Sequence, residues 1–182
     1  MIDPDKQIIE QIKSWIINVV VGCNFCPFAA KEVKRGSIHY EVNRSDDKAD
    51  LLKVLSAEFD RLDNYPVIET TLIILPGIYN DFNDYLDLIE LSEEFLEDQD
   101  YEGIYQIASF HPDYIFAGSS NDDPANYTNR SLYPMIHILR ESSITDALEN
   151  FPNPENIPQK NMDFARQKGL TYMRLLREAA FK

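Results

Sequence analysis

Positive charge is scarce in this sequence. Its 182 residues include 17 lysines and arginines against 31 aspartates and glutamates, which gives a formal net charge of −14. The basic residues are scattered along the chain. Proteins that bind duplex nucleic acid need a basic footprint, and anionic membrane surfaces attract basic segments. We therefore expect no nucleic acid and no membrane among the partners of this chain.

Cysteine is also scarce, because Cys23 and Cys26 are the only two. Two cysteines so close together do not support a disulfide framework. We therefore expect a reducing, cytoplasmic location. A zinc site made of four cysteines is excluded by the same count.

Long apolar runs are absent, since none reaches the roughly 20 residues that a membrane-spanning helix needs. The apolar segment 15–21 lies near the N-terminus, but acidic residues outnumber basic ones before it. A secretory signal needs a positively charged segment at that place. Apolar residues from Ile8 to Val20 recur at helical spacing, which predicts an amphipathic helix that ends at Gly22.

The rest of the chain alternates between strand and helix patterns. Expected strands cover residues 37–42, 67–75 and 104–110, and expected helices cover 46–63 and 81–98. Segment 134–140 fits either state. A strand is favoured because Ser143 with Asp146 resembles a fresh helix cap. A proline-rich linker at 150–158 comes next. After it we expect a last helix that is capped by Asp163 and interrupted or bent at Gly169.

These elements predict one α/β domain over residues 1–182, with a mixed sheet of about four strands packed against helices. A ferredoxin-like sandwich and a small mixed α/β sheet both fit the order of the elements. The irregular segment 111–131 is long for a compact domain, and such loops are usually functional or disordered. Its aromatic residues argue against disorder.

His111 follows a predicted buried strand, at the edge of the sheet where ligands collect in open α/β folds. Its side chain is suited to general acid/base chemistry, and Asp113 is near enough to orient it. The alternative is a rigid turn in which His111 satisfies backbone groups. Asp122 with Asp123 forms an acidic pair suited to a divalent cation or, more simply, to a solvated turn.

Two arginines are candidate anion clamps, because Arg130 follows a run of loop amides and Arg140 ends a predicted strand. The alternative for each is an ion pair with one of the many acids. His137 lies between isoleucines, which favours a hydrogen-bonded core histidine. His39 receives no role.

The Cys23-x-x-Cys26 pair follows a predicted helix, whereas a thioredoxin-like motif needs a strand before it and a helix after it. Dithiol redox chemistry is therefore disfavoured. Cys26 remains either a nucleophilic thiol or a small packed side chain.

Several motifs together are similar to those of the bacterial domain-of-unknown-function 1415 family: N-F-C-P-F-A at 24–29, E-T-T-L at 69–72, A-S-F-H-P-D-Y with F-A-G at 108–118, D-D-P-x-N-Y-T-N-R-S at 122–131 and Y-P-M-x-H-x-L-R-E at 133–141. The resemblance covers nearly the whole chain and implies no particular activity. Cys23 falls where the family has an aliphatic residue, which further weakens the dithiol interpretation. The positions that match the family pattern are Cys26, Pro27, Glu69, His111, Asp113, Asp123, Asn129, Arg130, His137 and Arg140.

Three hypotheses follow. The first is an enzyme or ligand site for a small anionic metabolite at the C-terminal edge of the sheet, with His111 as acid/base and Cys26 as a nucleophile. Its other residues are Asp113, Asn129, Arg130 and Arg140, with Asp123, Glu69 and His137 as further ligand contacts. The second is a non-catalytic binding or interaction module in which the same residues form a structural network. The third is a metal-assisted hydrolase with ligands from His111, Asp113, Asp122 or Asp123, and His137. No cofactor, substrate or oligomeric state follows from the sequence.

Overall fold

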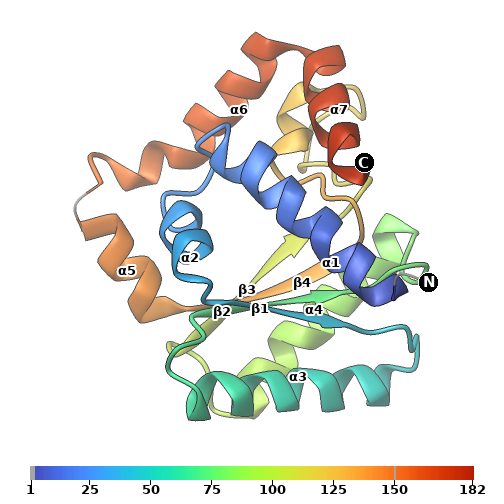
Figure 1. Cartoon of the computed structure of the whole chain (residues 1–182), viewed down its shortest axis with the longest axis vertical. Helices are drawn as coiled ribbons and strands as arrows, with labels where there is room; N and C mark the ends of the chain where they lie inside the picture. The colour runs from blue at the N-terminus through green and yellow to red at the C-terminus, as the bar shows by residue number, and fades with distance from the viewer. Residues whose placement is uncertain (1–2, 150) are drawn as a thin grey trace.

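The centre of the fold is a four-stranded mixed sheet in the order β1-β2-β4-β3 (Figure 1). The computed structural model describes residues 3–149 and 151–182. β1 runs parallel to β2, and β4 runs antiparallel to both β2 and β3. β1, β2 and β3 therefore end at the same edge of the sheet. The strands are β1 (Ile38–Val42), β2 (Thr70–Ile74), β3 (Tyr105–Phe110) and β4 (Met135–Arg140).

Strand β2 is buried along its whole length and divides the molecule into two cores. Neighbouring residues on a strand point to opposite faces of the sheet. Leu72 on β2 lies beside His137 on β4, and His137 lies beside Ala108 on β3, so these three form one row on one face. Ile73 belongs to the core on the other face.

Two long helices cover the face that carries Ile73 (Figure 1): α3 (Lys48–Asn64) and α4 (Phe82–Asp98). The carboxylates of Asp47 and Asp81 cap them by accepting hydrogen bonds from first-turn N–H groups. Their apolar faces pack against the sheet in a core of fully buried aliphatic and aromatic side chains, among them Leu55, Phe59 and Leu88.

The opposite face, which carries His137, is covered by more elements, mostly shorter (Figure 1). Within the described residues they are the α-helices α1 (Pro4–Trp15), α2 (Ala29–Arg35), α5 (Glu141–Glu149), α6 (Ile157–Lys168) and α7 (Leu170–Glu178), the π-helix η1 (Ile16–Val21), and the 3₁₀ turns η2 (Pro124–Thr128), η3 (Pro154–Asn156) and η4 (Ala179–Phe181). Gly169 separates α6 from α7. The two ends of the chain meet here, since Gln11 donates a hydrogen bond to the Phe181 carbonyl at 2.9 Å.

The π-helix directly follows α1. The Gly22 N–H donates to the Ile17 carbonyl at 3.0 Å, and the Phe25 N–H donates to the Val20 carbonyl at 2.9 Å. Both bonds span five residues instead of four. Such wide turns are rare in proteins and are frequent at functional sites.

The structure confirms one α/β domain with a four-stranded mixed sheet, the strand at 135–140 and the break at Gly169. The ferredoxin-like alternative is not what the order of elements shows. That fold repeats strand-helix-strand twice, whereas here no helix separates β3 from β4 in the chain except the short turn η2.

Three helix predictions were wrong. Helix α2 was missed because its seven residues are too few for a clear period. Helix α5 begins at Glu141 directly after β4, so Ser143 is inside it and does not cap it. Helix α6 begins at Ile157, within the expected linker, because Pro158 fits the first turn of a helix. Residue 150 of that linker lies outside the described residues.

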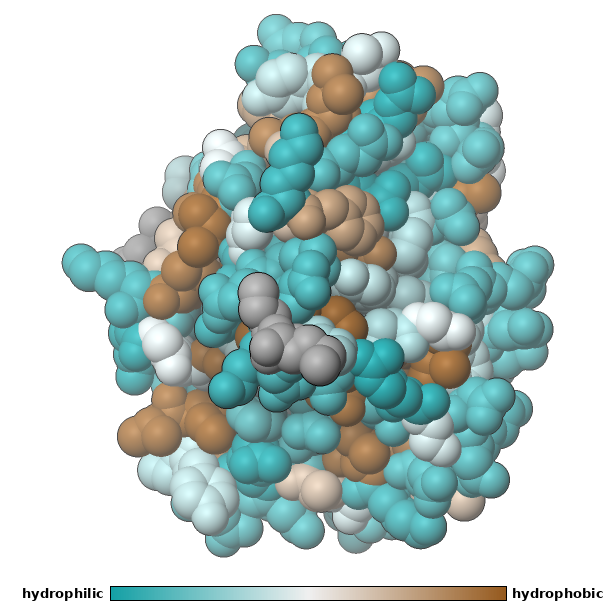
Figure 2. Space-filling view, turned by 45° about the vertical axis from the view of Figure 1, so that its right-hand side comes forward, coloured by the Kyte–Doolittle hydropathy of each residue, from teal (hydrophilic) through white to brown (hydrophobic). Residues whose placement is uncertain are grey.

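The surface is mainly polar. The face drawn in Figure 2 is mostly hydrophilic, and its apolar residues form separate small groups. No helix among residues 3–149 and 151–182 has both the length and the apolar character needed to cross a bilayer.

Candidate functional site

A cavity of about 410 Å³ lies between the His137 face of the sheet and the helices above it. Its volume falls in the range of small-molecule pockets. The elements above the sheet contribute the walls: the end of α1, the π-helix, α2, α5, the turn η3 and the start of α6. The floor is formed by residues of all four strands: Ile38, Thr70, Leu72, Gln106, Ala108, Phe110, His137 and Leu139.

The lining is largely apolar and carries few polar side chains. Of the described residues that line the cavity, none is lysine or arginine. Pockets of this kind gain affinity from apolar contact and specificity from a few placed polar groups. The polar groups here belong to Trp15, Cys26, Glu32, Thr70, Gln106 and His137.

His137 is a neutral hydrogen-bonding group in this cavity. Its Nε2 lies 2.7 Å from the Thr70 hydroxyl oxygen, and that hydroxyl donates to the Ile138 carbonyl at 2.6 Å. A hydroxyl has one proton, so Nε2 must be the donor to Thr70 and Nδ1 is left as an acceptor. Burial lowers the pKa of His137 to about 4, so the ring is neutral at physiological pH. The structure gives no hydrogen bond from a described residue to Nδ1.

Glu32 places a buried carboxylate in the cavity wall. It lies on α2 and is only 1% exposed. The Ser37 hydroxyl donates to Oε2, whereas Oε1 has no hydrogen-bond partner among the described residues. Nitrogen atoms of Lys31 and Arg35 lie 3.7 Å from the two oxygens and partly balance the charge. A buried oxygen without a partner costs stability, which makes it a place where a ligand gains a hydrogen bond.

Trp15 adds the complementary group. It is 1% exposed, and its indole N–H has no acceptor among the described residues. The ring packs edge-to-face on Phe110, with ring centroids 5.4 Å apart, which fixes its orientation. Two residues that line the cavity, Trp15 and Glu32, therefore each keep one buried polar atom without a hydrogen-bond partner among the described residues.

Cys26 also lines the cavity, close to the start of α2. Because α2 was missed, the sequence interpretation overlooked that a helix follows this thiol. Burial raises the pKa of Cys26, although the N–H groups of Phe28 and Ala29 act in the opposite direction. Burial also raises the pKa of Cys23, and both thiols are free. Cys26 is therefore protonated at neutral pH, which makes it a weak nucleophile.

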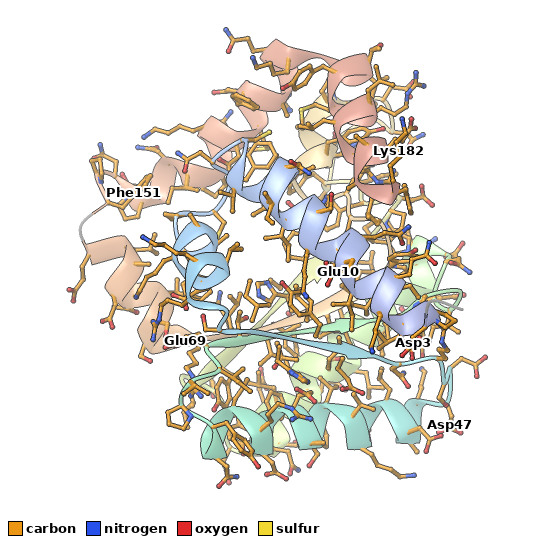
Figure 3. All side chains as sticks on the ribbon, viewed as in Figure 1. Asp3, Glu10, Asp47, Glu69, Phe151 and Lys182 are labelled. Atoms are coloured by element: carbon orange, nitrogen blue, oxygen red, sulfur yellow. The ribbon has the colours of Figure 1, made fainter. Side chains whose placement is uncertain are left out.

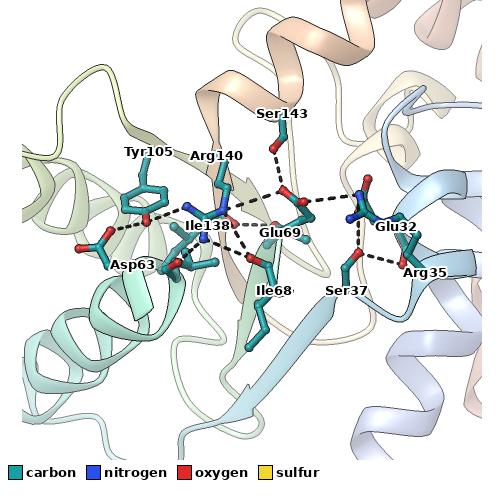
Figure 4. Close-up of polar contacts among 12 residues, drawn as sticks. Glu32, Arg35, Ser37, Asp63, Ile68, Glu69, Tyr105, Ile138, Arg140 and Ser143 are labelled. Atoms are coloured by element: carbon teal, nitrogen blue, oxygen red, sulfur yellow. Dashed lines mark hydrogen bonds and ion pairs between the residues drawn. The ribbon is translucent and has the colours of Figure 1, made fainter. Parts of the chain in front are cut away.

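Arg140 and Glu69 lie in a row of polar side chains across one edge of the sheet (Figure 4). Glu69 accepts a hydrogen bond from Ser143 at 2.7 Å and lies 3.5 Å from Arg35 and 3.9 Å from Arg140. The Arg140 guanidinium also donates to the carbonyls of Leu62 and Ile68 and to the Tyr105 hydroxyl. Its donors therefore serve the protein itself. Figure 3 shows Glu69 at the end of the sheet opposite to Asp47.

His111 lies at the other edge, just after β3, and is 0% exposed. Its Nε2 donates to the Tyr79 carbonyl at 3.0 Å, and its Nδ1 accepts the Asp113 N–H at 3.0 Å. The ring packs between Phe82 and Tyr85, at centroid distances of 5.2 and 4.8 Å. Burial lowers its pKa. Both nitrogens are occupied by backbone, which matches the turn alternative and leaves no atom for a substrate.

Asn129 and Arg130 hold the long loop to the sheet. The Asn129 carbonyl accepts the His111 N–H at 3.2 Å, and the Asn129 amide donates to the Ser109 carbonyl at 3.3 Å. Arg130 donates to the Tyr114 carbonyl at 3.0 Å and to Asn121 at 2.8 and 3.0 Å. These contacts satisfy the guanidinium within the protein.

Asp123 joins the loop to the C-terminal helices. It caps η2 by accepting the Ala125 N–H at 2.9 Å and pairs with Arg166 of α6 at 2.8 Å. The Arg166 hydrogen bond is the main reason that the pKa of Asp123 falls to about 2. Asp122 beside it is exposed. The two neighbouring acids therefore differ: Asp123 caps η2 and pairs with Arg166, whereas Asp122 is exposed to solvent.

The expected convergence is only partial. His111 and Asn129 are neighbours, and Cys26 and His137 share the cavity. Five residues of the first hypothesis do not line the cavity: His111, Asp113, Asn129, Arg130 and Arg140. The metal ligands of the third hypothesis are likewise separated, since His111 is saturated by backbone and Asp123 is paired with Arg166.

Sequence reasoning missed Trp15, Glu32 and Thr70 as residues of the site. Glu32 was hidden because its helix was not predicted. Trp15 looked like one apolar residue of an amphipathic helix, and only its orphaned N–H distinguishes it. The alternation of Met135, His137 and Leu139 on one face was the one available signal for this cavity floor.

Known proteins add the family but no activity. Searches of curated proteins and of solved structures find no match to this chain. A family model described as "Protein of unknown function (DUF1415)" matches residues 7–175. Because that match spans nearly the whole chain, the protein belongs to the DUF1415 family.

Proposed function

We propose that this protein binds a small molecule in the cavity on the His137 face of the sheet. The ligand has an apolar body and one polar head that both donates and accepts hydrogen bonds. One observation carries the proposal: two of the residues that line an apolar cavity of about 410 Å³, Trp15 and Glu32, each have a buried polar atom without a hydrogen-bond partner among the described residues. Buried polar atoms are nearly always paired, so two orphans in one pocket point to a missing partner.

The charge of the lining sets the class of the head group. Glu32 contributes an acid, His137 is neutral, and the described lining includes no basic side chain. An anionic head would lie beside the Glu32 carboxylate, whose charge Lys31 and Arg35 balance only in part, and no basic side chain of the described lining would pair with it. We therefore favour a neutral or cationic head, such as an alcohol or an amine. This proposal departs from the anionic metabolite expected from the sequence, whose candidate clamps, Arg130 and Arg140, bond within the protein.

Helix α5 supports an apolar body for the ligand. Ile144, Ala147 and Leu148 of this helix line the cavity, yet none of the described residues of α5 is buried. Their apolar surface is thus only partly covered in this structure. A ligand that fills the cavity would cover more of it, at a gain of about 25 cal/mol per Å² of apolar area.

Binding without catalysis fits the chemistry of the lining better than the enzyme hypothesis does. His137 has a free acceptor, but its pKa of about 4 makes it a weak base at neutral pH. Cys26 is protonated there, because burial raises its pKa. The cavity therefore offers hydrogen bonds and apolar contact, and it lacks an activated nucleophile with a strong base.

The first prediction concerns three ligands that share one apolar chain: 1-hexanol, hexylamine and hexanoate. Trp15 is the only tryptophan of the chain, so its fluorescence reports directly on the cavity wall. We expect saturable changes with hexanol and hexylamine and binding of hexanoate at least about tenfold weaker, because its carboxylate meets Glu32. Thermal unfolding should shift upward with the same order of ligands.

A cavity-filling variant controls this experiment. Ala108→Leu adds volume to the cavity floor and should abolish binding, whereas Ala49→Leu makes the same change on the exposed surface of α3 and should leave binding intact. Equal binding by both variants would show that the ligands bind elsewhere. Failure of all three ligands to bind the wild-type chain would contradict the proposal.

A further inference from the structure

Three metal-ligating side chains meet on the opposite face of the sheet, away from the cavity. His39 and Glu41 lie two residues apart on β1, so both point to the face covered by α3, and Glu58 of α3 faces them. One candidate ligand atom from each residue lies within 4.8 Å of the other two. Within the part of the chain that the structure describes, this is where three such groups gather.

The spacing fits an ion held between the groups. His39 Nε2 lies 3.6 Å from an oxygen of Glu41 and 3.6 Å from an oxygen of Glu58, which is too long for hydrogen bonds. Zinc–nitrogen and zinc–oxygen bonds of about 2.1 Å in a tetrahedron place neighbouring ligand atoms about 3.4 Å apart. The two distances from His39 are therefore close to those between coordinated ligand atoms, and all three atoms lie within 4.8 Å of one another.

Surrounding contacts already hold one ligand in place. Thr71 donates to Glu58 Oε2 at 3.2 Å, and Arg61 Nε lies 3.1 Å from both oxygens of Glu58. The Glu58 side chain is only 2% exposed. Hydrogen bonds of this kind orient carboxylate ligands in metal sites.

The second observation is an orphaned nitrogen. His39 Nε2 is shielded from solvent and has no hydrogen-bond partner among the described residues. The His39 side chain as a whole is 26% exposed, and its Nε2 faces both carboxylates, where a metal ion can bind. The Glu41 side chain is 37% exposed, which leaves a path for an ion to enter and room for water on the outer side.

We propose that His39 Nε2, Glu41 and Glu58 bind a divalent first-row transition ion of the Zn²⁺ type. One imidazole and two carboxylates suit such an ion, whereas Mg²⁺ prefers oxygen ligands alone. The competing occupant is a proton on Nε2, with which His39 would pair with both acids. This site lies on the other face from the cavity, so it does not depend on the proposed ligand function.

The second prediction tests this site by titrating the chelator-treated full chain with ZnCl₂ in a calorimeter. We expect one Zn²⁺ per chain. His39→Gln and Glu41→Gln should each weaken binding at least about tenfold, because each removes one ligand. Glu90→Gln neutralises an exposed acid on α4 and should leave the affinity unchanged.

Two further measurements separate the proposed site from other sources of binding. Zinc also binds thiols, so the Cys23→Ser/Cys26→Ser variant must retain the same affinity. Nitrogen NMR of the imidazoles should show the Nε2 signal of His39 shifting with Zn²⁺, while those of His111 and His137 stay in place. Any one of three results overturns the proposal. The His39 and Glu41 variants bind Zn²⁺ as tightly as the wild type, the thiol variant loses binding, or the wild-type protein gives no binding heat.

Discussion

The three histidines of this chain have the same side chain and three different environments. His111 uses both ring nitrogens to hold a turn. Among the described residues, His137 has a hydrogen-bond partner for one ring nitrogen only, and the Nε2 of His39 lies between two acids without a partner. Local sequence favoured His111 as the reactive histidine, because it follows a strand and precedes an aspartate. Our two proposals instead use the other two histidines, because free ring atoms are what a ligand or an ion can use.

The third prediction concerns His137 and pH. In the folded state its pKa is about 4, whereas an unfolded histidine titrates near 6.5. Below pH ~6.5 the unfolded chain binds a proton that the folded chain does not, so stability falls as pH decreases from about 6.5 to about 4. The contribution is on the order of 3 kcal/mol over that window. His111 has a lowered pKa and acts with the same sign.

Urea unfolding measured between pH 7 and pH 4 checks this prediction. His137→Gln cannot titrate there, so its stability should fall less steeply with decreasing pH than that of the wild type. Parallel curves for the two proteins would show that His137 has an ordinary pKa in the folded state.

The fourth prediction is that His111→Ala destabilises the protein by about 2–4 kcal/mol, because it leaves the Tyr79 carbonyl and the Asp113 N–H unpaired and opens space beside Tyr85. Urea unfolding measures the loss. Binding of hexanol by the folded variant should be unchanged, since His111 does not line the cavity. A stable variant that has lost ligand binding would instead support the role expected from the sequence.

At the scale of elements, the decisive pieces are short and irregular. Trp15 immediately precedes the π-helix, Cys26 lies in the loop between the π-helix and α2, and Glu32 lies on α2. All three residues line the cavity. Neither element has a strong period, because one has widened turns and the other has seven residues. The long elements, β2, α3 and α4, were predictable because many residues repeat one pattern in each.

The fifth prediction belongs to the contact between η2 and α6. Asp123→Ala removes the cap of η2 and the ion pair with Arg166, and we expect a loss of about 1 kcal/mol, mostly from the cap. The neighbouring Asp122→Ala is the matched control, because Asp122 is exposed, and it should change stability by less than about 0.5 kcal/mol. Chemical denaturation measures the free energy of unfolding of both variants. An equal loss in both would show that stability depends on the overall negative charge and not on the cap of η2.

At the scale of the whole molecule, one sheet serves two cores that are packed differently. The core under α3 and α4 is built from large, fully buried side chains. The core on the other face leaves a cavity in which small Ala108 lies beside His137. The cavity of about 410 Å³ is partly open to solvent, and it is the space in which we propose that a small molecule binds.

The sequence by itself determined the local and repetitive features of this protein: the strands, the long helices, the break at Gly169 and the placement of His137 on one face with Met135 and Leu139. Only the tertiary structure decided which polar atoms are left without partners. Whether a polar atom of Glu32, Trp15 or His39 lacks a hydrogen-bond partner among the described residues depends on which groups the fold brings near it. Packing of the whole chain fixes the distances between that atom and those groups. Hydrogen-bond saturation is a property of the folded whole, and no local pattern of residues encodes it.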